Sequence, residues 1–188
     1  MAEDSNLPLV PLDACCLLNL CATRQPENIL RTLPLRAAVA EMAAGEVRFL
    51  RRGGAGPDAN GRDAIDLQPL ISSGLLTLLR LETDQEIATF VQFAADLDDG
   101  EAMTIALALR RGLAVATDDR KALKLLARYA PHLPTFTTAG LLHQWAGIQQ
   151  PSLEELRRVL LDVQERARFA PSRHDPLQGW WQAALRKP

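Results

Sequence analysis

The stretch that decides the fold reads DDGEAMTIALALRRGLAVATDD and covers residues 98–119. Small and apolar residues recur in it at the spacing of one helix face, which predicts an α-helix over residues 99–111. Glycine commonly ends helices, so Gly112 is the expected end of this one. The apolar run over residues 113–117 predicts a buried strand directly after it. A helix that leads at once into a buried strand is typical of α/β proteins.

The rest of the chain continues this alternation. Further strands are predicted over residues 7–13, 75–81 and 134–137. Further helices are predicted over residues 14–23, 27–33, 35–44, 66–72, 85–96, 120–129, 139–146 and 152–169. The alternation favours an α/β fold with a parallel sheet and helices on both of its faces.

Length and composition set the domain organisation. In these 188 residues we expect one domain over residues 1–150, a glycine-rich surface loop inserted at 52–65, and a helical extension over 151–188. The loop lacks the Gly-Lys-Ser/Thr of a P-loop and the spacing of a dinucleotide fingerprint, so nothing here indicates nucleotide chemistry.

Charge and hydropathy narrow the partners and the compartment. The formal net charge of −2 gives no general attraction to nucleic acid, so a polyanion would need a local basic patch or a metal. No apolar stretch approaches the roughly 20 residues that span a bilayer, and Glu3 and Asp4 stand where a secretory signal has basic residues. We therefore expect a cytoplasmic protein that makes no contact with a membrane.

The cysteines and histidines indicate no site by their spacing. Cys15, Cys16 and Cys21 lack the Cys-x-x-Cys pattern of zinc or redox sites, so we expect reduced, apolar side chains. The three histidines share no metal-binding motif, and each is expected at the surface or in a loop.

Acidic residues follow or open several apolar segments. They are Asp13, Glu41, the pair Asp98-Asp99 with Glu101, and the pair Asp118-Asp119. In an open α/β sheet the carboxyl ends of the strands meet at one edge, so these carboxylates are expected to converge there. Several carboxylates in one place repel each other, and a hard cation such as Mg²⁺ or Mn²⁺ removes the conflict because it prefers oxygen ligands.

Each acid also has an ordinary structural interpretation. Asp13 and the pair Asp118-Asp119 precede helices and are suited to cap them. Asp98 and Glu101 have the spacing of a capping box. A solvated Glu41 is the simple alternative at that position, and Glu46, beyond the expected end of the helix, is a weaker candidate.

Four segments give the chain a resemblance to PIN-domain nucleases, a family that includes the toxins of many bacterial toxin–antitoxin pairs. They are LDACCLLNL at 12–20, AVAEM at 38–42, DDGEAMTIALA at 98–108 and ATDDRKA at 116–122. The resemblance covers residues 7–147. It implies a three-layer α/β/α sandwich with a central parallel sheet of about five strands, a doubly wound arrangement.

The resemblance also implies which residues form the active centre. The family's acids fall, in order, on Asp13, on Glu41, on Glu101 with Asp99 or Asp98 as helper, and on Asp118 or Asp119. Thr117 matches a small polar position beside this site. The cofactor implied is Mg²⁺ or Mn²⁺, held by Asp13, Asp99, Glu101, Asp118 and Asp119.

The implied activity is hydrolysis of phosphodiester bonds in single-stranded RNA by metal-activated water. Arg120, Lys121 and Lys124 follow the Asp pair and are the nearest candidates to bind substrate phosphates, unless they are solvated helix residues. Besides RNA, the expected partners are an antitoxin-like protein and a second copy of the chain.

Two other functions are weighed against the nuclease. One is a non-catalytic binding module in which Trp180 and Trp181 of the extension form a docking surface. The other is a phosphatase of a different α/β fold. It is disfavoured because Asp13 is not followed by a second Asp two residues later.

Overall fold

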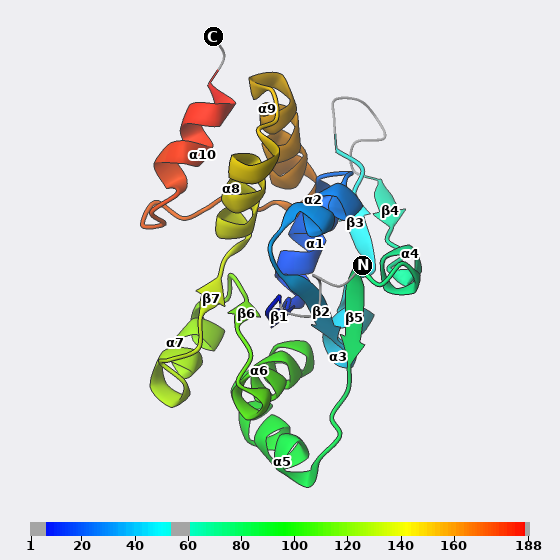
Figure 1. Ribbon diagram of the computed structural model, residues 1–188, viewed down its shortest axis with the longest axis vertical. Helices are drawn as coiled ribbons and strands as arrows, with labels where there is room; N and C mark the ends of the chain where they lie inside the picture. The colour runs from blue at the N-terminus through cyan, green and yellow to red at the C-terminus, as the bar shows by residue number, and fades with distance from the viewer. Residues whose placement is uncertain (1–6, 54–60, 187–188) are drawn as a thin grey trace. The chain divides into compact units, whose positions relative to one another are not determined.

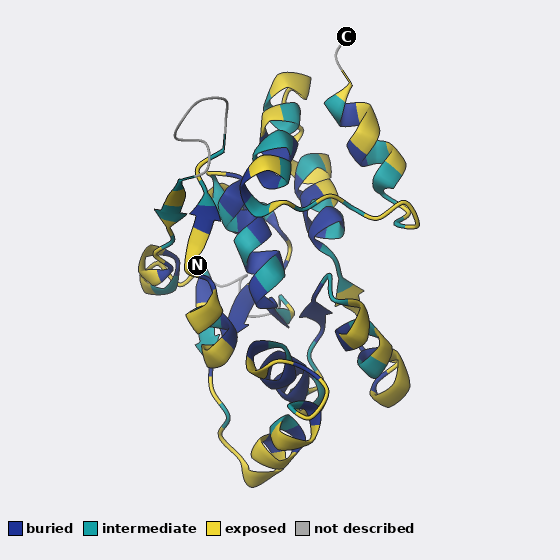
Figure 2. Cartoon of the chain, turned by 180° about the vertical axis from the view of Figure 1, so that it is seen from behind, coloured by how far each residue is buried: buried dark blue, intermediate teal, exposed yellow. Residues whose placement is uncertain are grey.

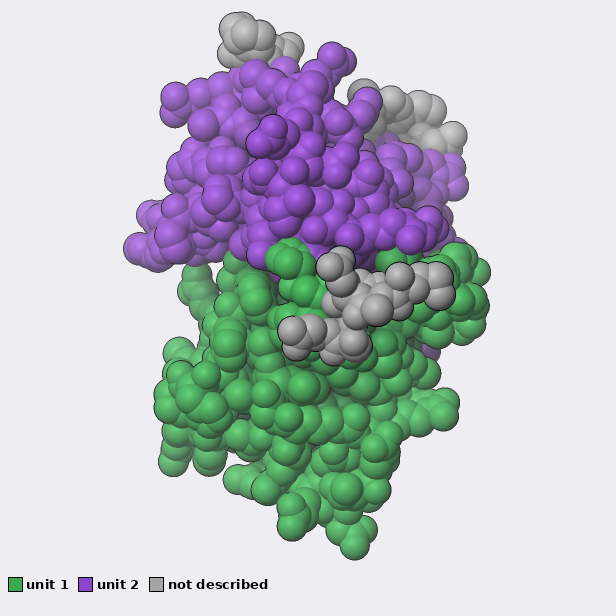
Figure 3. Space-filling view, viewed as in Figure 1, with its two compact units in different colours: residues 1–17, 34–47, 66–137 green, residues 18–33, 48–65, 138–188 purple. Residues whose placement is uncertain are grey.

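The computed structural model describes residues 7–53 and 61–186. It is a mixed α/β protein whose contacts group the chain into two compact units (Figure 3). The first unit comprises Met1–Leu17, Pro34–Val47 and Asp66–Thr137, and the second comprises Leu18–Leu33, Arg48–Ile65 and Thr138–Pro188. The predicted division at residue 150 falls inside the second unit and stays a prediction about domains.

The first unit is built on a parallel sheet of three strands in the order β1-β2-β5 (Figure 1). The strands are β1 (Leu9–Pro11), β2 (Arg36–Ala40) and β5 (Leu76–Leu79). Strand β2 is the central one, and Val39 on it is fully buried, as expected of a strand with neighbours on both sides. The predicted strands over 7–13 and 75–81 are confirmed.

The predicted helix over residues 35–44 is wrong. The chain instead forms strand β2 and then a short helix, α3 (Glu41–Glu46). An alanine-rich apolar run has the propensity of a helix, but parallel pairing on both sides makes this run a strand, because tertiary context overrides propensity. The error moves the start of the helix from residue 35 to Glu41.

A second pair of parallel strands, β6 (Val115–Ala116) and β7 (Thr135–Phe136), also lies in the first unit. A single parallel bridge joins Leu12, just beyond β1, to Ala116, and the N–H of Asp13 donates to the carbonyl of Ala116 at 2.9 Å. The parallel strands described in the first unit therefore form separate sheets of three and two. The expected single sheet of about five strands, a doubly wound arrangement, is not shown.

Helix α6 (Asp99–Arg111) is the central helix of the first unit and is buried along most of its length (Figure 2). It packs against α3, α5 (Asp84–Phe93), α7 (Arg120–Tyr129) and the strands β1, β2 and β6. Local signals account for its bounds, since Asp98 caps its start and Gly112 ends it with a φ of 64°. The predictions of helices over 99–111 and 120–129 are confirmed.

Three shorter helices complete the description up to Leu33 and around β5. They are α1 (Ala14–Ala22), which follows β1, α2 (Pro26–Thr32), and α4 (Gln68–Ser72). Each of them was predicted from apolar spacing and flanking turn residues, and each is confirmed.

The second unit is mainly helical. Its helices after residue 137 are α8 (Thr138–Gln149), α9 (Leu153–Asp162), the π-helical turn η2 (Val163–Ala167) and α10 (Gln178–Leu185). It also contains an antiparallel hairpin of β3 (Phe49–Arg51) and β4 (Arg62–Ala64). The loop predicted over 52–65 thus includes a strand, and its residues 54–60 lie outside the described residues.

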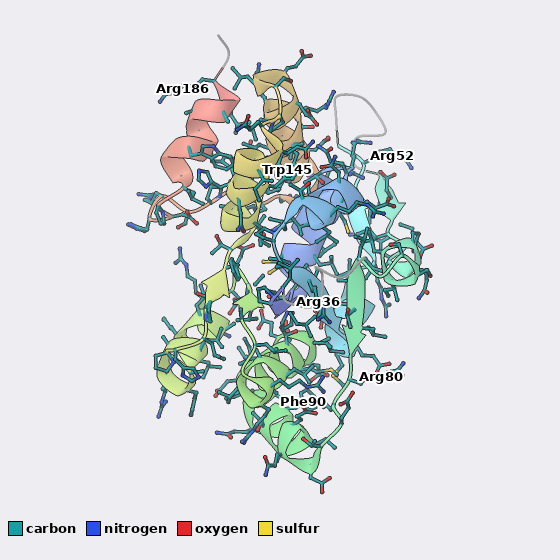
Figure 4. All side chains as sticks on the ribbon, viewed as in Figure 1. Arg36, Arg52, Arg80, Phe90, Trp145 and Arg186 are labelled. Atoms are coloured by element: carbon teal, nitrogen blue, oxygen red, sulfur yellow. The ribbon has the colours of Figure 1, made fainter. Side chains whose placement is uncertain are left out.

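Two tryptophans form the interior of the second unit. Trp145 and Trp181 are both fully buried, and Trp145 Nε1 donates to Asn28 Oδ1 at 3.1 Å (Figure 4). Trp181 packs edge-on against Phe169, with ring centroids 5.8 Å apart. Trp181 is therefore a core residue. Of the two tryptophans predicted to form a docking surface, Trp181 is not accessible to a partner. None of the described helices combines the length and apolar character of a membrane span.

Candidate metal centre

Asp13 is the most buried acid of the chain's first unit, with 3% of its surface exposed. Its Oδ1 accepts from the N–H of Ala14 at 2.6 Å, and its Oδ2 accepts from the Cys15 thiol at 3.1 Å and the Thr117 hydroxyl at 3.0 Å. Burial raises the pKa of the Asp13 carboxyl, and these hydrogen bonds oppose that rise. A buried carboxyl with a raised pKa is typical of functional sites.

Thr117 connects Asp13 to the acid pair that follows β6. It is fully buried, donates to Asp13 and accepts from the N–H of Asp119 at 3.1 Å. Asp119 Oδ1 in turn accepts from the N–H groups of Lys121 at 2.7 Å and Ala122 at 2.8 Å. The capping interpretation of Asp119 is therefore confirmed, and Thr117 is hydrogen-bonded to both Asp13 and Asp119.

Asp118 has a different environment from its neighbour. It is half-buried, and its Oδ2 accepts from the thiol of Cys16 at 3.4 Å. One acid of the pair therefore caps α7, while the other lies against a cysteine at the start of α1. Thr117 is hydrogen-bonded to both Asp13 and Asp119, so the segment that carries Asp118 and Asp119 lies beside Asp13.

Glu101 carries the clearest electrostatic signal in the chain. The pKa of its carboxyl is raised to about 7, first by burial and then by the charges of Asp98, Asp119, Asp13 and Glu46, in that order. Asp98 Oδ1 accepts from the N–H of Glu101 at 3.0 Å, so Asp98 caps α6 as predicted. Acids from four separate segments thus contribute to the raised pKa of one carboxyl group.

Glu46 joins this group from the last position of α3. The residue is exposed as a whole, yet its Oε1 accepts from the N–H of Gly100 at 3.1 Å, at the N-terminus of α6. Partial burial of the carboxyl raises its pKa, as do the charges of Asp98, Asp13 and Asp99. Asp99, the predicted helper, therefore acts on the cluster through Glu46.

Glu41, the second acid that the resemblance implies, is paired with an arginine. Its Oε1 accepts from Arg80 Nε at 2.9 Å, and 52% of the Glu41 side chain is exposed (Figure 4). It is not among the charges that raise the pKa of Asp13, Glu46 or Glu101. With β2 ending at Ala40, Glu41 is the first residue of α3 and Glu46 is the last, so the two side chains leave the helix at different ends.

The cysteines contribute a feature that spacing along the sequence does not predict. Cys15, Cys16 and Asp118 each offer a ligand atom, and these atoms lie within 4.8 Å of one another. In the described part of the chain this is the one group of three or more metal-ligating side chains gathered so closely. The carboxylates alone are spread more widely than this.

Basic residues on α7 lie next to the acids. Arg120, Lys121 and Lys124 are exposed, and none of them forms an ion pair with a described residue. Cations without an acidic partner are available to a phosphate group.

Carboxylate oxygens are the ligands that hard divalent cations prefer. Neighbouring negative charges contribute to the raised pKa values of Asp13, Glu46 and Glu101, and a cation bound beside these carboxylates would offset that repulsion. The groups that would hold the cation are thus Asp13, Glu101 and Asp118, with Glu46 and Asp119 at their side.

No protein-family model, curated protein or solved structure matches this chain. The resemblance to PIN-domain nucleases therefore depends on the segments and the geometry described above.

Proposed function

We propose that this chain is a metal-dependent nuclease with a PIN-like fold, which hydrolyses phosphodiester bonds of single-stranded RNA. The observation that carries the proposal is the raised pKa of Glu101, because acids from the ends of β1, α3 and β6 all contribute to it. A group of like charges held together by the fold is typical of a site that binds a cation.

The position of the acids relative to the strands supports the proposal. Joining the two sheets through the bridge between Leu12 and Ala116 gives the parallel order β7-β6-β1-β2-β5. In that order β2 lies on one side of β1 and β6 lies on the other. The position between β1 and β6 is then a topological switch point, where open α/β sheets bind ligands. Asp13 follows β1 and Thr117 follows β6, and they are hydrogen-bonded to each other.

The chemistry follows from the residues present. Asp13, Glu101 and Asp118 would hold Mg²⁺ or Mn²⁺, which when bound activates a water and offsets charge on the phosphate. Glu46 takes the place that was predicted for Glu41, since it reaches the N-terminus of α6. Arg120 and Lys121 lie directly after the acid pair and would bind phosphates beside the scissile one.

The first experiment is calorimetric titration of Mn²⁺ at neutral pH, which requires no knowledge of the RNA sequence. We expect Asp13→Asn and Glu101→Gln to weaken binding at least tenfold relative to the wild type, because each removes a charged ligand. Glu41→Gln is the matched control: it changes an acid of the same unit that pairs with Arg80, and binding should stay as in the wild type.

The companion assay incubates a fluorescently labelled single-stranded RNA with Mn²⁺ or Mg²⁺ and the same variants. Cleavage by the wild type and Glu41→Gln, together with loss in Asp13→Asn and Glu101→Gln, supports the nuclease. Equal Mn²⁺ binding by all four proteins, each folded by circular dichroism, would contradict it. An antitoxin-like partner and a second copy of the chain stay predictions from the resemblance.

A further inference from the structure

The structure holds two cysteines against the carboxylates of the acidic centre. Cys15 Sγ lies 3.1 Å from Asp13 Oδ2, and Cys16 Sγ lies 3.4 Å from Asp118 Oδ2. Ligand atoms of Cys15, Cys16 and Asp118 all lie within 4.8 Å of one another. Two adjacent residues at the start of α1 thus present both of their sulfur atoms to acids that follow different strands.

We propose that Cys15, Cys16 and Asp118 form a binding site for a thiophilic divalent cation, of which Zn²⁺ is the chief example, and that a water completes its shell. Zn²⁺ is held by sulfur at about 2.3 Å and by carboxylate oxygen at about 2.0–2.2 Å in a tetrahedron, so two of its ligand atoms lie about 3.3–3.8 Å apart. The 3.4 Å between Cys16 Sγ and Asp118 Oδ2 is close to this spacing, and the ligand atom of Cys15 lies within 4.8 Å of both.

The set of donor atoms sets this site apart from the proposed Mg²⁺ or Mn²⁺ centre. Hard cations bind oxygen, whereas thiolate ligands select zinc and softer metals. Each thiol releases its proton to the solvent as its sulfur binds the cation, so binding leaves two thiolates and one carboxylate around the metal. Cys15 and Asp118 are half-buried rather than enclosed, so a cation has access to them.

The two sites share ligands, and this gives the cysteines a regulatory consequence that rests on the proposed function. Asp118 cannot serve both cations at once, because a carboxylate oxygen that binds Zn²⁺ is lost to Mn²⁺. Zn²⁺ would therefore inhibit Mn²⁺-dependent cleavage by displacing the hard cation.

Cys21 provides a matched control within the same helix. It is half-buried like Cys15, but burial raises the pKa of its thiol to about 12, and the charge acting on it is that of Arg166. It is not part of the group of ligands around Asp118. Cys21→Ala therefore removes a thiol from α1 without changing the proposed site.

The test is titration of the reduced protein with Co²⁺, a spectroscopic substitute for Zn²⁺, in the presence of a phosphine reductant. We expect the wild type and Cys21→Ala to show a near-ultraviolet sulfur-to-cobalt charge-transfer band that Zn²⁺ abolishes. We expect Cys15→Ala and Cys16→Ala to lose most of the band. Absence of the band in the wild type, or its survival in Cys15→Ala, would overturn the proposal.

Circular dichroism and thermal melting of each variant show whether it is folded. Cys16 is fully buried, so its substitution carries the greater risk to the fold, and the half-buried Cys15 keeps the test decisive. The regulatory step is measured as the ratio of RNA cleavage with and without Zn²⁺ at fixed Mn²⁺, within each variant. We expect the Zn²⁺ concentration for half inhibition to rise at least tenfold from Cys21→Ala to Cys15→Ala.

The two proposals fail separately. A cobalt–thiolate band in a protein that cleaves no RNA would support the site and overturn its regulatory role. Mn²⁺-dependent cleavage without such a band, and without selective inhibition by Zn²⁺, would overturn the thiolate site and leave the nuclease intact.

Discussion

Replacing Gly100 with alanine tests the close packing that brings Glu46 to the acidic centre. A Cβ on Gly100 would collide with the carboxylate of Glu46 and would lie 3.0 Å from the Cα of Ala43. The carboxylate can rotate away, but it then loses its hydrogen bond from the N–H of Gly100. Ala43 belongs to the backbone of α3, so relief of the second contact requires α3 to shift away from α6.

The magnitude follows from three contributions. Loss of the hydrogen bond to Glu46 costs about 1 kcal/mol, and the crowding against Ala43 costs about 1–3 kcal/mol as overpacking does elsewhere. Alanine returns up to about 1 kcal/mol of helix propensity, less at the second position of a helix than in its interior. We expect Gly100→Ala to lower the free energy of unfolding by about 1–4 kcal/mol.

Urea denaturation followed by circular dichroism measures this change, and Gly147→Ala is the matched control. Gly147 lies inside α8, and a Cβ there would meet no atom within 4 Å. Its substitution should therefore raise the free energy of unfolding by about 0.5–1 kcal/mol. If Gly100→Ala is as stabilising as Gly147→Ala, then α3 and α6 are not packed as described, and the assignment of Glu46 to the centre fails.

Three further substitutions test other parts of the structure. Hydrogen bonds, led by that of Arg111, lower the pKa of Glu86 from 4.5 to about 2. This pair therefore stabilises the fold above pH 4.5 and loses its effect as the pH falls toward 2. Glu86→Gln should lower the free energy of unfolding by about 2 kcal/mol at pH 7 and reduce its dependence on pH at acidic pH, as measured by urea titration. Burial and neighbouring acids raise the pKa of Glu101 to about 7. The free energy of unfolding of the metal-free protein should therefore fall by about 1 kcal/mol as the pH rises from 5 to 8. In the same assay Glu101→Gln should remove this loss, and Mn²⁺ should oppose it. The buried Arg166 donates to the Ala22 carbonyl at 2.8 Å and to Asp63 at 3.2 Å, so Arg166→Met should lower the free energy of unfolding by about 3 kcal/mol.

The parts of the fold that local chemistry decides were predictable from the sequence. Helix α6 begins after Asp98, which caps it, and ends at Gly112 in the left-handed conformation, and both are signals that a single sequence carries. Helix α7 begins in the same way after Asp119. The short strand between these helices has to be buried, because its residues are apolar and no helix fits between two such boundaries.

Where tertiary pairing decides, the sequence was not enough. Residues 36–40 form β2 because β1 and β5 lie on both sides, and an alanine-rich run contains no local signal for that pairing. Glu41 and Glu46 stand at the two ends of the short helix α3 that follows this strand.

The grouping of the cysteines with Asp118 was likewise not predictable from the sequence. Spacing rules detect ligands that are close in sequence, and Cys15 and Cys16 match none of them. The contact of Cys16 with Asp118 joins residues 102 positions apart, so only the folded chain brings them together. The direct pairing of Asp13 with Thr117, 104 positions apart, has the same origin. The resemblance implies a place for Thr117 beside the acids, but it does not predict this hydrogen bond.

Helix capping explains some of the acids in the centre but not all of them. Asp98 and Asp119 accept backbone N–H groups of α6 and α7, so they stabilise the fold whether or not a metal binds. Asp13 and Glu101 differ, because their raised pKa values mean that their ionised forms cost folding free energy at neutral pH. A cation that binds only the folded state offsets this cost, as a ligand at 100 times its Kd contributes about 2.7 kcal/mol. Residues that weaken a fold are expected where function requires them, so Asp13 and Glu101, rather than the two caps, are the acids whose substitution distinguishes a metal centre from ordinary helix capping.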